Sequence, residues 1–170
     1  IVMTMYGAYC VIGDICLAQC ASLKEAMHAA GLMSRFLIRC NLMKSDYDAE
    51  VKRTNRIGVS LTGIHEFAWN MFGLTFREML DTEYGPAQEF WRFISALRQY
   101  TCNEAAIYSH EVGMVVPHTT TTIKPSGTIS KVLACTEGAH LPALAYYLRW
   151  VQYQHDDPQV ADLVARGYPI

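Results

Sequence analysis

The sequence has few charged side chains and no long apolar run. Of its 170 residues, 18% are charged, and 14 basic against 16 acidic side chains leave a net charge of −2. Soluble domains typically carry about 25% charged residues, so this composition indicates a chain with little solvated surface. A near-neutral chain has no general attraction to a phosphate backbone, which argues against a nucleic-acid partner. The apolar fraction of 51% also excludes intrinsic disorder.

Signals for membrane insertion and secretion are also missing. Charged residues, Gly or Pro interrupt each apolar stretch before the roughly 18 to 20 residues that a membrane span needs. Ile1 stands first, and no charged segment followed by an apolar core and a small-residue cleavage site is recognisable. We therefore expect a cytoplasmic protein with no membrane partner. Because both ends look cut from something longer, we interpret residues 1–170 as part of a larger domain and expect no complete independent domain.

The cysteines form no recognised metal-binding pattern. The chain has six of them, at Cys10, Cys16, Cys20, Cys40, Cys102 and Cys135. Their spacing makes neither a Cys-x-x-Cys pair nor a zinc ribbon, and no pair of histidines completes a site. In a chain without a secretory signal, most are expected to be reduced packing residues. We predict no metal site and assign no role to Cys102 or Cys135.

Two kinds of hydrophobic spacing alternate along the chain. β-favouring residues with glycines predict a short strand within residues 1–20 and a buried strand over 56–63. Apolar side chains at three- and four-residue steps predict a long helix over about 23–51, which Ser22 and Glu25 begin as a capping box. Strands that alternate with helices are typical of an α/β fold with buried parallel strands.

The same alternation continues in the second half. The pattern there predicts a helix over 64–72, a long helix from Gly85-Pro86 to about Gly113, a strand over 119–123, a turn over 124–128, a helix over 129–134, a strand near 145–153 and a final helix capped by Asp157.

The turn after residues 119–123 is the most informative segment for function. It contains Pro125, Ser126, Gly127 and Thr128, followed by Ile129 at the start of a predicted helix. Gly127 allows a close backbone approach, and the two hydroxyls lie beside the amides of a helix N-terminus, so the segment suits a phosphate group. It is not a Gly-x-x-x-x-Gly-Lys-Ser/Thr loop. A capped turn with no ligand explains the same spacing, and both interpretations stay open on these residues alone.

Other candidates for chemistry are weaker. Cys10 lies in an irregular segment, where its thiol is either a redox group or a small buried core residue. Among the histidines His65, His118 and His140, the last is the best candidate because it follows the phosphate-like turn, although a lone histidine is usually structural.

Three stretches of the chain together resemble the large chains of ribonucleotide reductases. The first is Lys52-Arg53-Thr54-Asn55-Arg56-Ile57-Gly58-Val59-Ser60-Leu61-Thr62-Gly63-Ile64. The second is Thr121-Thr122-Ile123-Lys124-Pro125-Ser126-Gly127-Thr128-Ile129-Ser130 followed by Glu137-Gly138-Ala139-His140, which is similar to the substrate-phosphate loop of the monomeric, adenosylcobalamin-dependent class II enzymes. The third is Gln154-His155-Asp156-Asp157-Pro158 with Gly167-Tyr168. These motifs span nearly the whole chain in the family's order.

The resemblance implies a fold and a reaction. The fold is a ten-stranded α/β barrel, of which residues 1–170 would be a part. The reaction is reduction at the 2′ carbon of a ribonucleotide, carried by a thiyl radical and started by homolysis of the cobalt–carbon bond of adenosylcobalamin. The implied partners are a ribonucleoside triphosphate substrate and a thioredoxin-like reductant, and the parent enzyme is expected to be a monomer.

The resemblance also implies roles for particular residues. Pro125, Ser126, Gly127, Thr128 and Ile129 match the family's substrate-phosphate loop. Cys10 falls near the position of one of the two cysteines that supply reducing equivalents and end as a disulfide. The family's radical cysteine stands in a motif like Asn-x-Cys-x-Glu-Ile, which this chain lacks, and the second redox cysteine belongs to an N-terminal barrel strand. We therefore expect residues 1–170 alone to be inactive.

Two other hypotheses remain at this point. The chain could belong to a class I reductase large chain, which needs a separate radical-generating subunit. It could also be a non-catalytic module that binds nucleotide phosphates.

Overall fold

The computed structural model describes residues 8–138, 152–154 and 156–169. Its centre is a parallel pair of strands, β1 (Val11–Cys16) and β2 (Ile57–Thr62), in which Val11 pairs with Ile57 and Cys16 with Thr62. Between them the chain forms a short 3₁₀ helix, η1 (Leu17–Gln19), and two α-helices. The expected α/β class with parallel strands is therefore confirmed, while the ten-stranded barrel stays a prediction.

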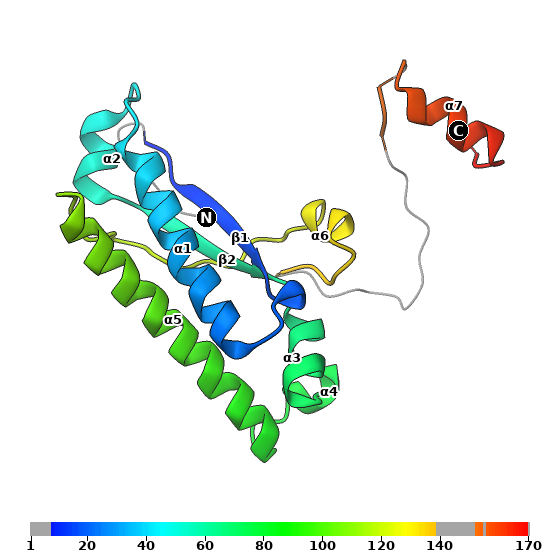
Figure 1. Ribbon diagram of the computed structural model, residues 1–170, viewed down its shortest axis with the longest axis horizontal. Helices are drawn as coiled ribbons and strands as arrows, with labels where there is room; N and C mark the ends of the chain where they lie inside the picture. The colour runs from blue at the N-terminus through cyan, green and yellow to red at the C-terminus, as the bar shows by residue number, and fades with distance from the viewer. Residues whose placement is uncertain (1–7, 139–151, 155, 170) are drawn as a thin grey trace.

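Two long helices pack on each other and beside the sheet (Figure 1). These are α1 (Leu23–Leu42) and α5 (Gly85–Glu111), which lie side by side along much of their length. The inner face of α5 includes Phe90, Leu97, Thr101 and Ala105, which are all buried. Small residues let the helices approach closely: a side-chain carbon at Gly31 of α1 would lie 3.3 Å from the Tyr100 ring.

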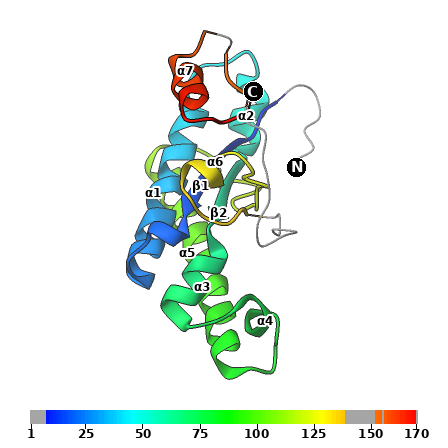
Figure 2. The same ribbon diagram turned by 90° about the vertical axis from the view of Figure 1, so that its right-hand side faces the viewer.

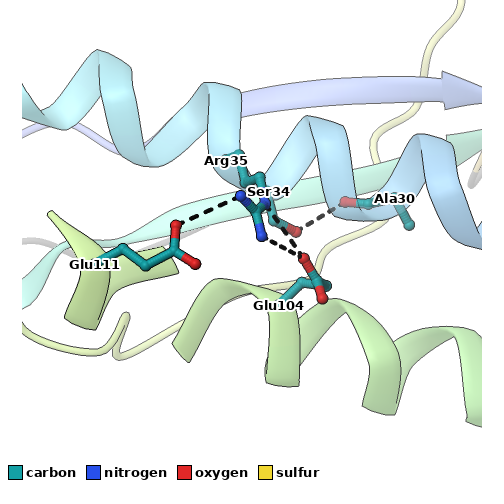
Figure 3. Close-up of polar contacts among 5 residues, drawn as sticks. All are labelled: Ala30, Ser34, Arg35, Glu104 and Glu111. Carbon is teal, nitrogen blue, oxygen red and sulfur yellow. Dashed lines mark hydrogen bonds and ion pairs between the residues drawn. The ribbon is translucent and has the colours of Figure 1, made fainter. Parts of the chain in front are cut away.

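An arginine on α1 adds polar contacts to this helix pair (Figure 3). Arg35 donates to Glu104 at 3.2 Å and to Glu111 at 3.5 Å, both on α5, and its guanidinium lies 5.0 Å from the centre of the Tyr108 ring. The Arg35 side chain is 38% exposed. Ion pairs this exposed contribute at most about 1 kcal/mol, so apolar packing is the main source of stability here.

The predicted helix over 23–51 is wrong in one respect, because it is two helices. The chain leaves helical geometry at Met43 and begins again in α2 (Asp48–Thr54). Asp48 Oδ1 accepts a hydrogen bond of 2.7 Å from the Ser45 amide, which supports the second start. The predicted capping box is half formed: Ser22 accepts from the Glu25 amide at 3.1 Å, but Glu25 accepts from Ala21 instead of the capping residue.

A predicted strand is also missing from the edge of the sheet. Residues 119–123 run parallel to β2, and the Ile57 and Val59 amides donate to Thr119 and Thr120 carbonyls at 3.0 and 2.8 Å. The only ladder pairing there within the described residues is the single bridge between Val59 and Thr121. Pairing stops because the Lys124 amide donates to the Ser60 side chain, at 2.9 Å, instead of a backbone carbonyl.

The remaining helices are short. They are α3 (Ile64–Phe72), α4 (Phe76–Met79), α6 (Ile129–Val132) and α7 (Pro158–Ala165). Figure 2 shows α3 and α4 together at one end and α6 beside the sheet. Helix α6 is shorter than predicted, whereas the Asp157 cap of α7 is confirmed by a 2.9 Å bond from the Gln159 amide. Most of the strand expected near 145–153 lies outside the described residues, and residues 152 and 153 form no strand.

None of the helices within residues 8–138 or the described part of the C-terminal segment is long and apolar enough to cross a bilayer.

Gly63 provides a test of the junction between β2 and α3. Its φ of +72° is left-handed, and an added side-chain carbon would lie 2.6 Å from the Ala18 Cβ atom and 3.0 Å from its amide nitrogen. Gly113 has the same φ of +72° but no atom within 4 Å of that position. Both Ala substitutions cost about 1 kcal/mol for the backbone, and Gly63→Ala adds about 1–3 kcal/mol from overpacking.

We therefore expect Gly63→Ala to lower the urea midpoint of unfolding more than Gly113→Ala does, in the polypeptide that carries this chain. Equal midpoints for the two variants would show that the close contact with Ala18 does not constrain the junction.

Candidate functional site

The predicted phosphate loop leaves the edge of the sheet beside two polar side chains, with which it is in contact. We call residues 124–129 the 124–129 loop. Ser60 on β2 is fully buried and accepts a hydrogen bond from the Lys124 amide at 2.9 Å. Asp14 on β1 is the residue that pairs with Ser60 in the parallel register. The loop therefore starts above a serine and an aspartate that the strand pairing places side by side.

Asp14 ties the loop to β1. Its Oδ2 atom accepts from Lys124 Nζ at 2.7 Å and from Ser126 Oγ at 3.1 Å. The Asp14 side chain is only 8% exposed, against 37% for Lys124. Its other oxygen, Oδ1, is buried and receives no donor from the described residues. We call Asp14, its donors Lys124 and Ser126 and its register partner Ser60 the Asp14 anchor.

The anchor keeps this carboxylate charged. Burial by itself raises the pKa of Asp14, but hydrogen bonds from Lys124, Ser60 and Ser126, with the charge of Lys124, outweigh burial and lower the pKa. A lowered carboxyl pKa means that the folded state favours the ionised form, and this stabilisation is fully present above about pH 4. It is lost as the pH falls through the lowered pKa, so the anchor is intact at neutral pH.

Ser126 is held in an unusual backbone conformation. Its φ is +56°, in the left-handed region that non-glycine residues rarely adopt. Three bonds hold this part of the loop: Ser126 Oγ to Asp14 at 3.1 Å, the Ser130 amide to the Ser126 carbonyl at 3.0 Å, and the Gly138 amide to the Pro125 carbonyl at 3.2 Å. The Ser126 hydroxyl, predicted to face a ligand, is engaged with Asp14 in this structure.

The other side of the loop is open. A side-chain carbon added at Gly127 would meet no atom within 4 Å. Thr128 precedes α6, and its side chain caps none of the described amides of that helix. Because α6 has only four residues, Ile129 to Val132, its dipole is small, and the loop's own donors must do most of any anion binding. The structure thus groups the five predicted loop residues into a buried half, with Ser126, and an open half around Gly127.

The other predicted residues lie away from this loop. Cys10 precedes β1 and is half-buried, and the four residue steps from Cys10 to Asp14 along extended chain span about 13 Å. Burial raises the pKa of the Cys10 thiol, and Arg56 only partly offsets this. The His65 ring lies against the Phe76 ring, with ring centres 4.9 Å apart and the planes tilted by 51°. His140 lies outside the described residues.

One pair of cysteines was missed by sequence reasoning. Cys16 and Cys135 are free thiols whose sulfurs are 3.8 Å apart. Burial, together with the hydrogen bond and charge of Cys16, raises the pKa of Cys135 to about 12, so this thiol stays protonated at neutral pH. The two residues are 119 positions apart, and neither neighbourhood carries a motif that could have indicated the contact. Across the described ranges, no group of three His, Cys, Asp or Glu side chains could hold a metal ion.

The segment that follows α6 is fastened to α3. Glu66 accepts from the Thr136 amide at 2.7 Å and from its hydroxyl at 2.6 Å, while the Thr136 carbonyl accepts from the Gly63 amide at 3.0 Å. The segment formed by the 124–129 loop and α6 is therefore attached at both ends, to β1 and β2 before it and to α3 after it.

Buried asparagines hold the start of β2. Asn55 is fully buried in left-handed geometry, with φ of +44°. It accepts from Asn41 at 2.9 Å and donates to Ser109 at 3.2 Å and to the Val115 carbonyl at 2.8 Å. This amide links α1, α5 and the segment that leads to residues 119–123, and so it fixes where β2 begins.

Comparisons with known proteins agree with the motifs. No protein-family model matches the chain. The adenosylcobalamin-dependent ribonucleoside-triphosphate reductase of Lactobacillus gasseri is 31% identical over 164 residues, which is 86% of this chain and 21% of that protein. The enzyme of the same name from Lacticaseibacillus paracasei is 29% identical over 153 residues, covering 82% of this chain and 20% of that protein.

A solved structure supports the fold. The crystal structure of a B12-dependent, class II ribonucleotide reductase superimposes with a TM-score of 0.62 and 21% identity, over 77% of this chain and 20% of that one. The chain therefore spans about a fifth of the length of the relatives that it matches. Its motifs, its fold and these similarities together identify the chain as a homologue of the adenosylcobalamin-dependent ribonucleotide reductases.

Proposed function

We propose that this chain is a segment of an adenosylcobalamin-dependent ribonucleoside-triphosphate reductase and forms part of its catalytic barrel. The observation that carries the proposal is the match to reductases of that name over 82% and 86% of the chain. The topology agrees, because β1, β2 and residues 119–123 run parallel and are connected through helices, as in successive units of an α/β barrel.

In this proposal the 124–129 loop binds the phosphates of the substrate. The Lys124 ammonium group, which is paired with Asp14 and 37% exposed, is a further hydrogen-bond donor beside the loop. A side-chain carbon added at Gly127 would meet no atom within 4 Å, which leaves room for an oxyanion on that side of the loop, and the Thr128 hydroxyl lies next to it in sequence. Phosphate groups carry charge that these donors offset, whereas the base and ribose need contacts from elsewhere in the barrel. The Lys-Pro-Ser-Gly-Thr form of the loop favours a triphosphate.

Cys10 is proposed as one of two thiols that supply the reducing equivalents. Replacing a 2′ hydroxyl by hydrogen consumes two electrons and two protons and releases water. Two thiols provide both when they become one disulfide, and a thioredoxin-like dithiol then restores them by exchange. The Cys10 thiol is free and half-buried at the start of β1. Its partner would come from another part of the reductase.

The pocket beside residues 119–123 is small for a cobalamin. A pocket between β2, α5 and residues 119–123 has a volume of about 290 Å³ and is lined by Val59, Leu97 and Thr121 among others. Sites for drug-sized molecules start at about 300 Å³, and a corrinoid is much larger than such molecules. We therefore assign no cobalamin contact to this chain and place the cofactor against other parts of the enzyme.

Cofactor dependence tests the proposal. We expect the full polypeptide that contains this chain to reduce ribonucleoside triphosphates with adenosylcobalamin and a dithiol, and with no second protein. The deoxyribonucleotide product is measured by chromatography. Activity that needs a separate radical-generating subunit would assign the chain to a class I large chain instead. Tight triphosphate binding without any reduction under either condition would favour a non-catalytic binding module.

Gly127→Val tests the phosphate loop. The first carbon of the new side chain would meet no atom within 4 Å, so we expect the fold to be kept while the added bulk shields this side of the loop from an oxyanion. We expect the dissociation constant of a ribonucleoside triphosphate, measured by calorimetric titration, to rise at least about tenfold, or 1.4 kcal/mol. Gly85→Val is the matched control, because Gly85 also has nothing within 4 Å and lies at the start of α5. Unchanged affinity in Gly127→Val would place the phosphates elsewhere.

Cys10→Ser tests the redox role. We expect multiple turnover with a dithiol reductant to fall to background, since no disulfide can form at this position. Formation of the radical, followed by electron paramagnetic resonance, should persist. Cys102→Ser, at another half-buried free cysteine, is the control and should turn over normally. Sustained turnover in Cys10→Ser would remove Cys10 from the reaction.

A further inference from the structure

The most unusual group near the 124–129 loop is the Asp14 carboxylate. A phosphate site normally gathers positive charge and donors, yet here a side chain that is 8% exposed and negatively charged lies directly beneath the loop. It accepts from Lys124 Nζ and Ser126 Oγ through the same oxygen, at 2.7 and 3.1 Å. Burying a charge is costly unless an opposite charge and hydrogen bonds compensate for the lost water, and Lys124 and Ser126 provide both for Asp14.

Asp14 contacts the strained residue of the loop, Ser126. Holding Ser126 at φ of +56° costs of order 1–3 kcal/mol, and such strain persists only where surrounding contacts enforce it. The hydroxyl bond to Asp14 is one of those contacts. At the next residue, Gly127, an added side-chain carbon would meet no atom within 4 Å. Because Asp14 holds Ser126, it also sets the direction of the Gly127 backbone.

We propose that Asp14 is a positioning residue for triphosphate binding: it touches no substrate, but its bonds to Ser126 and Lys124 hold the 124–129 loop in its phosphate-binding conformation. This inference rests on the proposed function of the loop and adds a residue from a different strand. The main role of Ser126 is then to fix the loop backbone through its bond to Asp14, and donation to a phosphate is secondary. Lys124 balances the carboxylate and keeps its partly exposed ammonium group close to the loop.

Asp14→Asn tests the proposal in the full polypeptide. The amide has nearly the same shape, but it loses the charge that binds Lys124 and Ser126. We expect the dissociation constants of a ribonucleoside triphosphate and of inorganic tripolyphosphate to rise together by about tenfold, or 1.4 kcal/mol. In turnover, KM should rise by a similar factor with kcat within about twofold. A variant that merely folded poorly would lose kcat through its inactive fraction and keep KM, and that outcome would overturn the proposal.

Asp48→Asn is a matched control. Asp48 also accepts from a lysine and a serine, Lys52 at 2.7 Å and Ser45 Oγ at 3.3 Å, but on α2. The Asp48→Asn substitution should leave the dissociation constants of the triphosphate and of tripolyphosphate unchanged. A rise equal to that of Asp14→Asn would mean that any lost lysine–carboxylate pair weakens binding, and it would refute a specific role for Asp14.

Two changes at Ser126 separate conformation from direct contact. Ser126→Ala removes the bond to Asp14 and keeps the strained backbone, whereas Ser126→Gly removes the same bond and relieves the strain. We expect about a tenfold loss of triphosphate affinity in Ser126→Ala and a clearly smaller loss in Ser126→Gly. Equal losses would show that the hydroxyl itself binds phosphate, which contradicts a conformational role for Ser126.

The results also distinguish this inference from the proposed function. If Gly127→Val weakens triphosphate binding but Asp14→Asn does not, the phosphate loop stands and the positioning role fails. If neither substitution matters, the loop binds no phosphate and both fail. If both weaken binding in a polypeptide that performs no reduction, the positioning role stands and the reductase assignment fails.

Discussion

The register between β1 and β2 is the constraint on which the candidate site depends. It pairs Asp14 with Ser60, and these two side chains accept hydrogen bonds from Lys124 and Ser126, which lie much later in the sequence. A shift of one residue in either strand would turn its side chain to the opposite face of the sheet. The loop would then lose its bonds to the sheet, so the conformation of residues 124–129 is a consequence of strand pairing more than of local turn preference.

Register in turn depends on buried contacts at both ends of β2. Before the strand, the Asn55 amide links helices α1 and α5 to the strand start through its bonds to Asn41 and Ser109. After it, Gly63 allows close contact with the turn that follows β1. Buried polar groups of this kind are costly when unpaired, so slipped pairings that break them are disfavoured. Apolar packing stabilises the layer, and these few polar contacts select its alignment.

Much of the fold could be predicted from the sequence, because strands and helices follow from local spacing and caps. Strands β1 and β2, the bounds of α3 and α5, and the Asp157 cap are confirmed. The predictions failed where distant contacts decide. Residues 119–123 have high β propensity, yet the Ser60 side chain takes the Lys124 amide and pairing ends. The site was half predictable for the same reason: a turn motif identifies the 124–129 loop, but nothing near Asp14 indicates its partners 110 and 112 residues away.

The two faces of the loop explain how a carboxylate can belong to a phosphate site. Like charges repel, so a free aspartate here would weaken anion binding. Asp14 is instead 8% exposed, and its charge is balanced by Lys124 at 2.7 Å, so a ligand above Gly127 would meet a nearly neutral pair. What remains is the geometric effect of the bond to Ser126. That bond fixes a strained residue before any ligand arrives, so the ordering cost is met during folding, and binding is strengthened to the same extent. A buried acid can thus favour an anion when it acts on the backbone that receives it.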